Sequence, residues 1–97
     1  MYGLIGKMIA LDGKRDELTA ILIAGTQNMP GCKSYIVAND LVDANSLWIT
    51  EVWDSKEKHT QSLALPSVIE AISKGKPLIA GFGERFETSP QGGQGLL

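Results

Sequence analysis

The order of strand-like and helix-like segments is the feature that most constrains this 97-residue chain. Runs rich in Ile, Leu, Val and aromatic residues predict strands, and the stretches with apolar residues at helical spacing predict helices. Strands are expected over residues 2–11, 32–39, 47–53 and 78–87, and helices over residues 14–27, 54–65 and 66–74. With right-handed crossovers, the order β-α-β-β-α-β predicts an α+β fold, a ferredoxin-like sandwich whose four-stranded antiparallel sheet carries its helices on one face.

Several residues indicate where the helices begin and end. Asp12 is expected to cap the first helix, and Asp54, with Glu57 three residues later, has the spacing of a capping box. Pro66 is expected to interrupt the second helical region, because proline has no amide hydrogen to donate. Gly75 is expected to end that region. Residues 1–88 then form one ferredoxin-fold domain, and residues 89–97 form a Gly-rich tail that is expected to be flexible.

The predicted strands are apolar on both faces. In residues 47–53, Leu47, Ile49, Glu51 and Trp53 point to one side, and the other side is also mainly apolar. A similar division places Phe82 and Phe86 on one side of the last strand. Helices cover only one face of such a sheet, and a large exposed apolar face is a liability on a monomer. The pattern therefore predicts a homodimer that packs through the open sheet faces.

Composition narrows the classes of partner. Nine Lys and Arg against eleven Asp and Glu give a net charge of −2, with no basic stripe for nucleic acid. The first apolar run has no basic residues before it and is too short to cross a bilayer, so neither a signal peptide nor a membrane anchor is expected. A single cysteine, Cys32, fits a reducing cytoplasm. We therefore expect a cytoplasmic protein with a small-molecule partner.

Three residues, Glu51, Trp53 and His59, suggest a catalytic site. Glu51 and Trp53 leave the same face of a strand, and His59, the only histidine, lies at the start of the helix that folds back over that strand. A cavity lined by these three would hold a general base, a carboxylate that orients it and an aromatic wall. In the alternative interpretation His59 is a surface or packing residue and Trp53 is core. The buried carboxylate could equally pair with Arg85 or Lys7.

The remaining candidates are weaker. Tyr35 and Phe82 are expected to be core, with a chance of lining the pocket. Gly81 and Gly83 lie within a predicted strand rather than between a strand and a helix, so they favour a bulge over a dinucleotide-binding turn. Cys32 has no second cysteine beside it. No metal site and no bound cofactor are expected.

Three segments resemble the antibiotic biosynthesis monooxygenase domain family. They are PGCKSY, WITEVWDSKEKHTQSL and ALPSVIEAISKGKPLI, and the likeness extends over residues 2–88. The resemblance implies a dimeric α+β barrel in which two sheets pack together. It also implies a pocket between helices and sheet, lined by Glu51, Trp53 and His59. Several members of the family oxidise quinols or polycyclic phenols with O2 and no flavin, haem or metal.

The resemblance leaves more than one function open. It favours a cofactor-independent monooxygenase in which His59 is the base, Glu51 its partner and Trp53, Tyr35 and Phe82 bind an aromatic substrate. The superfamily also contains haem-degrading enzymes, but Ser62 and Ile72 stand where those enzymes have Trp and His. An isomerase-like enzyme on the same scaffold, and a non-enzymatic dimeric binding or stress-associated module, are the alternatives.

Overall fold

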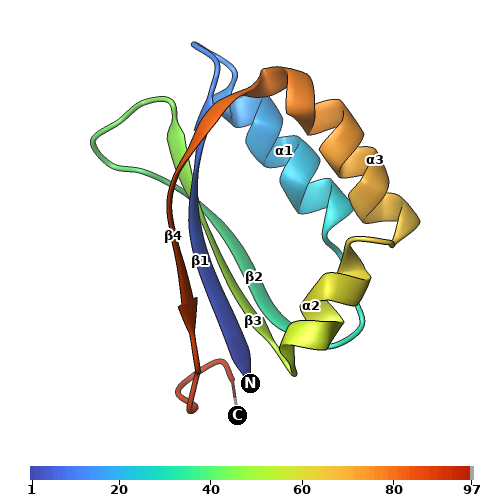
Figure 1. Cartoon of the computed structure of the whole chain (residues 1–97). Helices are drawn as coiled ribbons and strands as arrows, with labels where there is room; N and C mark the ends of the chain where they lie inside the picture. Colours follow the sequence, from blue (N-terminus) through green and yellow to red (C-terminus); the bar gives the residue numbers. More distant parts are fainter. Residues whose placement is uncertain (97) are drawn as a thin grey trace.

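The computed structural model describes residues 1–96 and shows a single sheet with all of its helices on one side (Figure 1). The elements are β1 (Tyr2–Ala10), α1 (Arg15–Gly25), β2 (Cys32–Asn39), β3 (Ser46–Trp53), α2 (Lys56–Ser62), α3 (Pro66–Gly75), a 3-10 turn (Lys76–Leu78) and β4 (Ile79–Thr88). The strands pair antiparallel in the order β2-β3-β1-β4. This arrangement confirms the predicted ferredoxin-like α+β fold.

The N-caps of α1 and α2 lie two residues and one residue later than predicted, at Lys14 and Ser55. Asp12 does not cap α1, and its Oδ1 accepts a hydrogen bond from Asn45 Nδ2 at 2.6 Å instead. Asp54 does not cap α2 either, because its carboxylate lies 3.5 Å from Lys33 Nζ. Ser55 takes that role, and its Oγ accepts a hydrogen bond from the backbone N–H of Lys58 at 3.2 Å.

Proline separates the last two helices as predicted. Helix α2 ends at Ser62, three residues before the expected position, and Pro66 occupies the first turn of α3. Its missing N–H costs nothing there, because the first N–H groups of a helix have no partner within the helix. The break lets α2 turn toward the end of β3 while α3 lies beside α1 (Figure 1).

The core consists of two clusters between the sheet and the helices. One cluster, near α2, centres on the fully buried Trp53 with Tyr2, Leu4, Met29 and Val68. The other, near the start of α1, joins Ala10, Leu18, Leu47 and Ile49. Tyr35 packs against both. The space between the two clusters is the site described below.

A bulge in β4 reverses the faces of its two phenylalanines. Gly6 pairs with Arg85 and Met8 with Phe82, so β4 has one residue more than β1 between these pairs. The predicted placement of Phe82 and Phe86 on one side is therefore wrong. Phe82 shares the helix side of the sheet with Met8, whereas Phe86 pairs with Ile5 on the open side. The glycine-rich segment of this strand does contain a bulge, as its sequence predicts.

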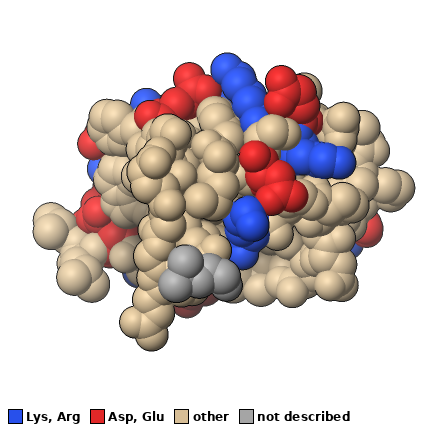
Figure 2. Space-filling view, turned by 90° about the horizontal axis from the view of Figure 1, so that it is seen from below, with Lys and Arg blue, Asp and Glu red and all other residues tan. Residues whose placement is uncertain are grey.

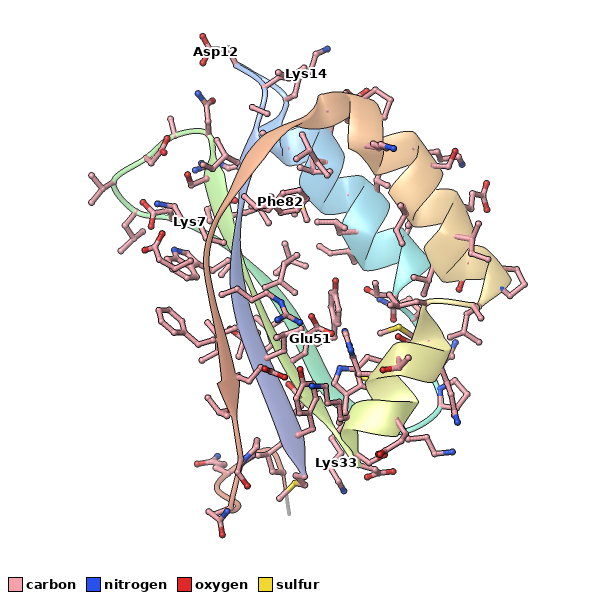
Figure 3. All side chains as sticks on the ribbon, viewed as in Figure 1. Lys7, Asp12, Lys14, Lys33, Glu51 and Phe82 are labelled. Carbon is pink, nitrogen blue, oxygen red and sulfur yellow. The ribbon has the colours of Figure 1, made fainter. Side chains whose placement is uncertain are left out.

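The face without helices is apolar. Ile36 and Phe86 are 55% and 53% exposed there, next to half-buried Ile5, Trp48 and Val52. On the same face, Lys7 Nζ lies 5.8 Å from the centroid of the Trp48 ring, and Figure 3 shows Lys7 on the side of the sheet away from Glu51. The sequence pattern therefore predicts the character of this face correctly.

Beyond β4 the chain turns back toward the start of β1. Pro90 lies so near the backbone of Gly3 that a Cβ on that glycine would be 2.9 Å from its ring. The predicted flexible tail includes Leu97, which lies outside the described residues. The division into a domain and a flexible tail stays a prediction. Across residues 1–96, no helix has the length and apolar character needed to cross a membrane.

Acidic and basic side chains alternate at the end of the molecule that holds both termini. Figure 2 shows Lys and Arg side chains beside Asp and Glu side chains on that face. Lys56 Nζ lies 3.2 Å from Glu87 Oε2, for example. Exposed pairs of this kind contribute little to stability, but they keep this face mixed in sign.

Candidate active site

All five candidate residues of the sequence analysis line one half-open cavity between the sheet and the helices. The cavity has a volume of about 350 Å3, at the lower end of the range for small-molecule sites. Glu51 and Trp53 project from β3, His59 from α2, Tyr35 from β2 and Phe82 from β4. In Figure 3, Glu51 and Phe82 both lie in the space between sheet and helices, Glu51 nearer to α2. Their roles in function stay predictions.

Strand alternation and the turn after β3 bring Glu51, Trp53 and His59 together. Glu51 and Trp53 are two residues apart, so both leave the helix side of the sheet. The Ser55 cap starts α2 immediately after β3, and His59 lies one turn into this helix. The side chains of His59 and Glu51 are only 17% and 11% exposed. The expected convergence is therefore present in the structure.

The contacts among these three side chains fix the carboxylate more firmly than the imidazole. Trp53 Nε1–H donates a hydrogen bond to Glu51 Oε1 at 3.0 Å. His59 Nε2 lies 3.8 Å from the same oxygen, which is too far for a hydrogen bond but close enough for a charge interaction. The imidazole stands edge-on to the Trp53 ring, with 5.6 Å between the ring centroids. Nε2 therefore lies beside a carboxylate, and both side chains line the cavity.

Burial makes Glu51 an unusual carboxyl group. Desolvation raises its pKa above the ordinary 4.5, against the opposing effects of the Trp53 hydrogen bond and of the positive charges of His59 and Arg85. Burial also raises the pKa of Tyr35, and the charge of Glu51 adds to the effect. Tyr35 is therefore a neutral hydroxyl group inside the cavity, able to donate a hydrogen bond.

The structure decides between the two alternative partners proposed for Glu51. Arg85 lines the cavity with Glu51, and its charge lowers the pKa of that carboxyl. Lys7 points to the opposite face of the sheet, so its pairing with Glu51 is ruled out. Arg85 reaches the cavity only because the β4 bulge places it opposite Gly6, on the helix side.

The sequence analysis missed two residues next to the cavity. Tyr2 lies against His59, with 5.8 Å between ring centroids, and its hydroxyl donates to Glu87 Oε2 at 2.7 Å. Its position follows from the pairing of Tyr2 with Trp53 across β1 and β3, which strand order alone does not specify. Gly6 lies in the sheet beside Glu51 and Arg85, and a Cβ there would meet nothing within 4 Å. That space belongs to a neighbouring hollow of about 220 Å3, which shares Glu51, Phe82 and Arg85 with the cavity.

Of the other residues singled out from the sequence, Cys32 lies apart from the cavity and Ser62 lines it. Cys32 is half-buried at the start of β2, where burial raises the pKa of its thiol, and it does not line the cavity. Within residues 1–96, no three His, Cys, Asp or Glu side chains gather as a metal-binding group would. Ser62 lines the cavity with its hydroxyl group turned to the backbone, where it donates to the carbonyl oxygen of His59.

Comparisons with known proteins agree on one family. The family model "Antibiotic biosynthesis monooxygenase" matches residues 1–74. The crystal structure of a candidate antibiotic biosynthesis monooxygenase from Chloroflexus aurantiacus is 59% identical, with a TM-score of 0.95 and coverage of 98% of this chain and 97% of that chain. A second candidate, from Deinococcus radiodurans, is 29% identical with a TM-score of 0.77, over 96% and 95% of the two chains.

The same fold recurs at much lower identity. A protein of Pseudomonas aeruginosa is 16% identical, with a TM-score of 0.80 over 94% of each chain. At this identity the likeness concerns the fold alone. Comparison with curated proteins finds no match.

Proposed function

The chain belongs to the antibiotic biosynthesis monooxygenase family, and we propose that it oxidises a quinol or phenolic small molecule with O2, without a bound cofactor. One observation carries the proposal: His59 Nε2 lies 3.8 Å from the buried carboxylate of Glu51, in a cavity walled by aromatic rings. Imidazole takes up and releases protons near neutral pH, and the carboxylate stabilises its protonated form.

In the proposed reaction the substrate supplies all of the electrons. His59 takes the proton of a phenolic hydroxyl group, and the electron-rich phenolate transfers electrons to O2. A bond forms between a ring carbon and one oxygen atom, the O–O bond breaks, and the second oxygen leaves as water with protons from the ring and from His59. Hydroquinone and O2 thus give hydroxyquinone and water, and four electrons pass from the ring to oxygen.

Each of the five candidate side chains has a part in this proposal. Glu51 stabilises the protonated His59, and the Trp53 N–H holds that carboxylate in place. Trp53 and Phe82 provide flat apolar surface for the ring. Tyr35 offers a hydroxyl donor to an oxygen of the substrate. The apolar walls limit the contact of water with the reactive oxygen species, which protects the product from side reactions.

The test is O2 uptake with hydroquinone as substrate. The protein is expected to accelerate uptake, and His59→Ala is expected to return the rate to that of the solution without protein. Gln61→Ala, an exposed position on the same helix, is the matched control and should behave as the unmodified protein. If His59→Ala matches the unmodified protein, His59 is not the base.

An isomerase-like reaction is the second candidate, because the pair of His59 and Glu51 can also shuttle a proton between two carbon atoms of a carbonyl compound. Turnover that persists without O2 would select it. In the non-enzymatic alternative the same cavity holds a ligand without reaction, or is filled. A closed pocket with His59 turned to solvent would favour it, whereas here the cavity is half-open and the His59 side chain is 17% exposed.

We also propose that two copies associate through their open sheet faces, in the cytoplasm. Support comes from the exposed Ile36 and Phe86 on a face that no helix covers, since apolar faces of this kind mark interfaces. The single Cys32 fits a reducing compartment. Sedimentation should give a dimer mass, and Phe86→Asp should shift the protein toward the monomer. A monomer at micromolar concentration for the unmodified chain would refute the association.

A further inference from the structure

The imidazole of His59 is held in the site without a hydrogen bond to its ring. Among residues 1–96, the hydrogen bonds of the structure include none to or from an imidazole nitrogen, and Nε2 stops 3.8 Å from Glu51 Oε1. The last side-chain torsion of histidine has only a broad preference, so the rotamer alone does not fix the ring. Packing against neighbouring side chains must therefore keep Nε2 beside the carboxylate.

Two aromatic rings provide that packing. Tyr2 and Trp53 are partners in the pairing of β1 with β3, so they stand next to each other on the helix side of the sheet. The centroid of the His59 ring is 5.6 Å from that of Trp53 and 5.8 Å from that of Tyr2, with interplanar angles of 75° and 44°. Both separations lie within the range of attractive ring pairs. The imidazole therefore rests on two rings, not on one.

Only one of these two rings lines the cavity. Trp53 does so, whereas Tyr2 is not part of the lining and lies against His59. Tyr2 is 9% exposed and belongs to the core cluster around Trp53. A substrate in the cavity is able to touch Trp53, but Tyr2 reaches the reaction only through His59.

Further contacts fix the Tyr2 ring in place. Its hydroxyl group donates to Glu87 Oε2 of β4 at 2.7 Å, and Lys56 Nζ lies 5.9 Å from the centroid of its ring. Lys56 Nζ also lies 3.2 Å from Glu87 Oε2. Lys56 and His59 are three residues apart on α2, so they share one face of that helix. The Tyr2 ring thus meets α2 at two residues while its hydroxyl group is tied to β4.

We propose that Tyr2 is a positioning residue, whose ring holds the His59 imidazole at the Glu51 carboxylate. The inference rests on the proposed function for the task of His59 as the base, but the contact itself is a matter of structure. The ring carries the effect rather than the hydroxyl group, because the hydroxyl group is directed to Glu87. A displacement of about 1 Å in a reacting group is able to cost about 10²-fold in rate, so turnover depends on this support.

The first readout is nuclear magnetic resonance of the imidazole, which needs no substrate. His59 is the only histidine, so its carbon-bound ring protons give a single set of signals. In the unmodified protein and in Tyr2→Phe, these protons are expected to show nuclear Overhauser contacts with the ring protons of Trp53. In Tyr2→Leu the imidazole gains freedom to rotate, so the contacts should weaken. Contacts of unchanged strength in Tyr2→Leu overturn the proposal.

The second readout is O2 uptake with hydroquinone. Tyr2→Leu should lower kcat by about 10- to 10²-fold and leave KM unchanged, because Tyr2 acts on the base and does not touch the substrate. Tyr2→Phe keeps the ring and should restore kcat. If Tyr2→Phe loses as much as Tyr2→Leu, the ring is not the support and the proposal is wrong.

A core variant controls for loss of stability. Leu47→Val changes a fully buried residue of the other core cluster, which does not line the cavity. It should lower the melting temperature and keep kcat. Equal losses of kcat in Tyr2→Leu and Leu47→Val would assign the effect to stability and refute the positioning role. Should Tyr2→Leu melt early, Tyr2→Met, which also lacks a ring, must give the same ordering.

The outcomes separate this inference from the proposed function. If the contacts weaken in Tyr2→Leu but the unmodified protein does not accelerate O2 uptake, the monooxygenase proposal fails and the support of the imidazole by Tyr2 stands. If hydroquinone is oxidised and Tyr2→Leu keeps its kcat, turnover does not depend on Tyr2. The positioning role then fails and the monooxygenase proposal stands.

Discussion

Two carboxylates in this protein accept a hydrogen bond from a tryptophan indole, and their surroundings give them opposite properties. Trp48 Nε1–H donates to Asp40 Oδ1 at 2.9 Å, and Trp53 Nε1–H donates to Glu51 Oε1 at 3.0 Å. Asp40 also accepts the backbone N–H groups of Val42 and Asp43, at 3.0 and 2.7 Å. These bonds lower the pKa of Asp40 to about 2, whereas burial raises that of Glu51.

The difference separates a structural carboxylate from a reactive one. Asp40 holds the turn between β2 and β3, where Arg15 Nη1 also donates to the carbonyl oxygens of Asp43 and Ser46 at 3.0 and 3.2 Å. Three donors of the protein already occupy the Asp40 carboxylate. Glu51 keeps lone pairs free toward a cavity, next to a proton acceptor. A buried carboxylate with spare hydrogen-bonding capacity is a better candidate for function.

The largest expected effect is that of Glu51→Gln on turnover. Gln keeps an oxygen to accept the Trp53 N–H but removes the charge that stabilises protonated His59. Turnover in the O2-uptake assay should fall by about 10²-fold or more, in the range of general acid–base contributions. The melting temperature should not fall, because a desolvated charge is lost. Unchanged turnover would place Glu51 with Asp40 among the structural carboxylates.

Trp53→Phe should have the largest effect on stability. Trp53 is fully buried, so the change leaves a void and deprives the buried Glu51 oxygen of its donor. We expect a loss of about 2–3 kcal/mol in the free energy of unfolding, measured by urea titration. Trp48→Phe is the matched control. Trp48 is only half-buried, and its partner Asp40 keeps two backbone donors, so the loss should be smaller. Equal losses would contradict the contrast between the two pairs.

Asp40→Asn should lower stability and spare activity. One face of an Asn amide carries hydrogen atoms, so it cannot accept from the indole and from two backbone N–H groups together. The melting temperature should fall by a few degrees, while turnover stays at that of the unmodified protein. A loss of turnover without a loss of stability would show that the turn communicates with the cavity.

The pH dependence of stability should change in opposite directions at the two sites. Asp40 has a lowered pKa, so its contribution is present above the ordinary value of 3.8 and is lost as pH falls through about 2. Glu51 has a raised pKa, so the stability that its protonated form gives is present below 4.5 and is lost as pH rises through the folded value. Asp40→Asn should flatten the acid side of a melting-temperature profile, and Glu51→Gln the side above pH 4.5.

Much of the fold follows from local signals. Strands β1, β2 and β3 lie within one residue of their predicted ends, because each is an apolar run closed by turn residues. Pro66 separates α2 from α3 as predicted, because proline has no amide hydrogen to donate within a helix. The predicted cap of α2 is wrong by one residue, because Asp54 and Ser55 are both able to accept an N–H group. Only the path of the chain decides which of them does so.

The sequence predicts the part of the candidate site whose residues are close together in the chain. It does not predict the part that strand pairing brings in from distant segments. Glu51, Trp53 and His59 converge through strand alternation and one tight strand-to-helix connection. Arg85 reaches the cavity, and Tyr2 reaches His59 behind it, through the register of β1 with its two neighbours, which no local pattern encodes. The glycines of β4 predict a bulge. Which face of the sheet the later side chains point to, however, depends on which residue is unpaired.

The bulge beside Gly83 also limits which insertions and deletions β4 is able to accept. Phe82 on the cavity side and Phe86 on the open side belong to one edge strand, and the extra residue between them sets their opposite directions. Deleting one residue there would turn the rest of the strand over, exposing Arg85 on the outer face and directing Phe86 inward. Substitutions on either surface are independent of each other, whereas an insertion or a deletion here alters both at once.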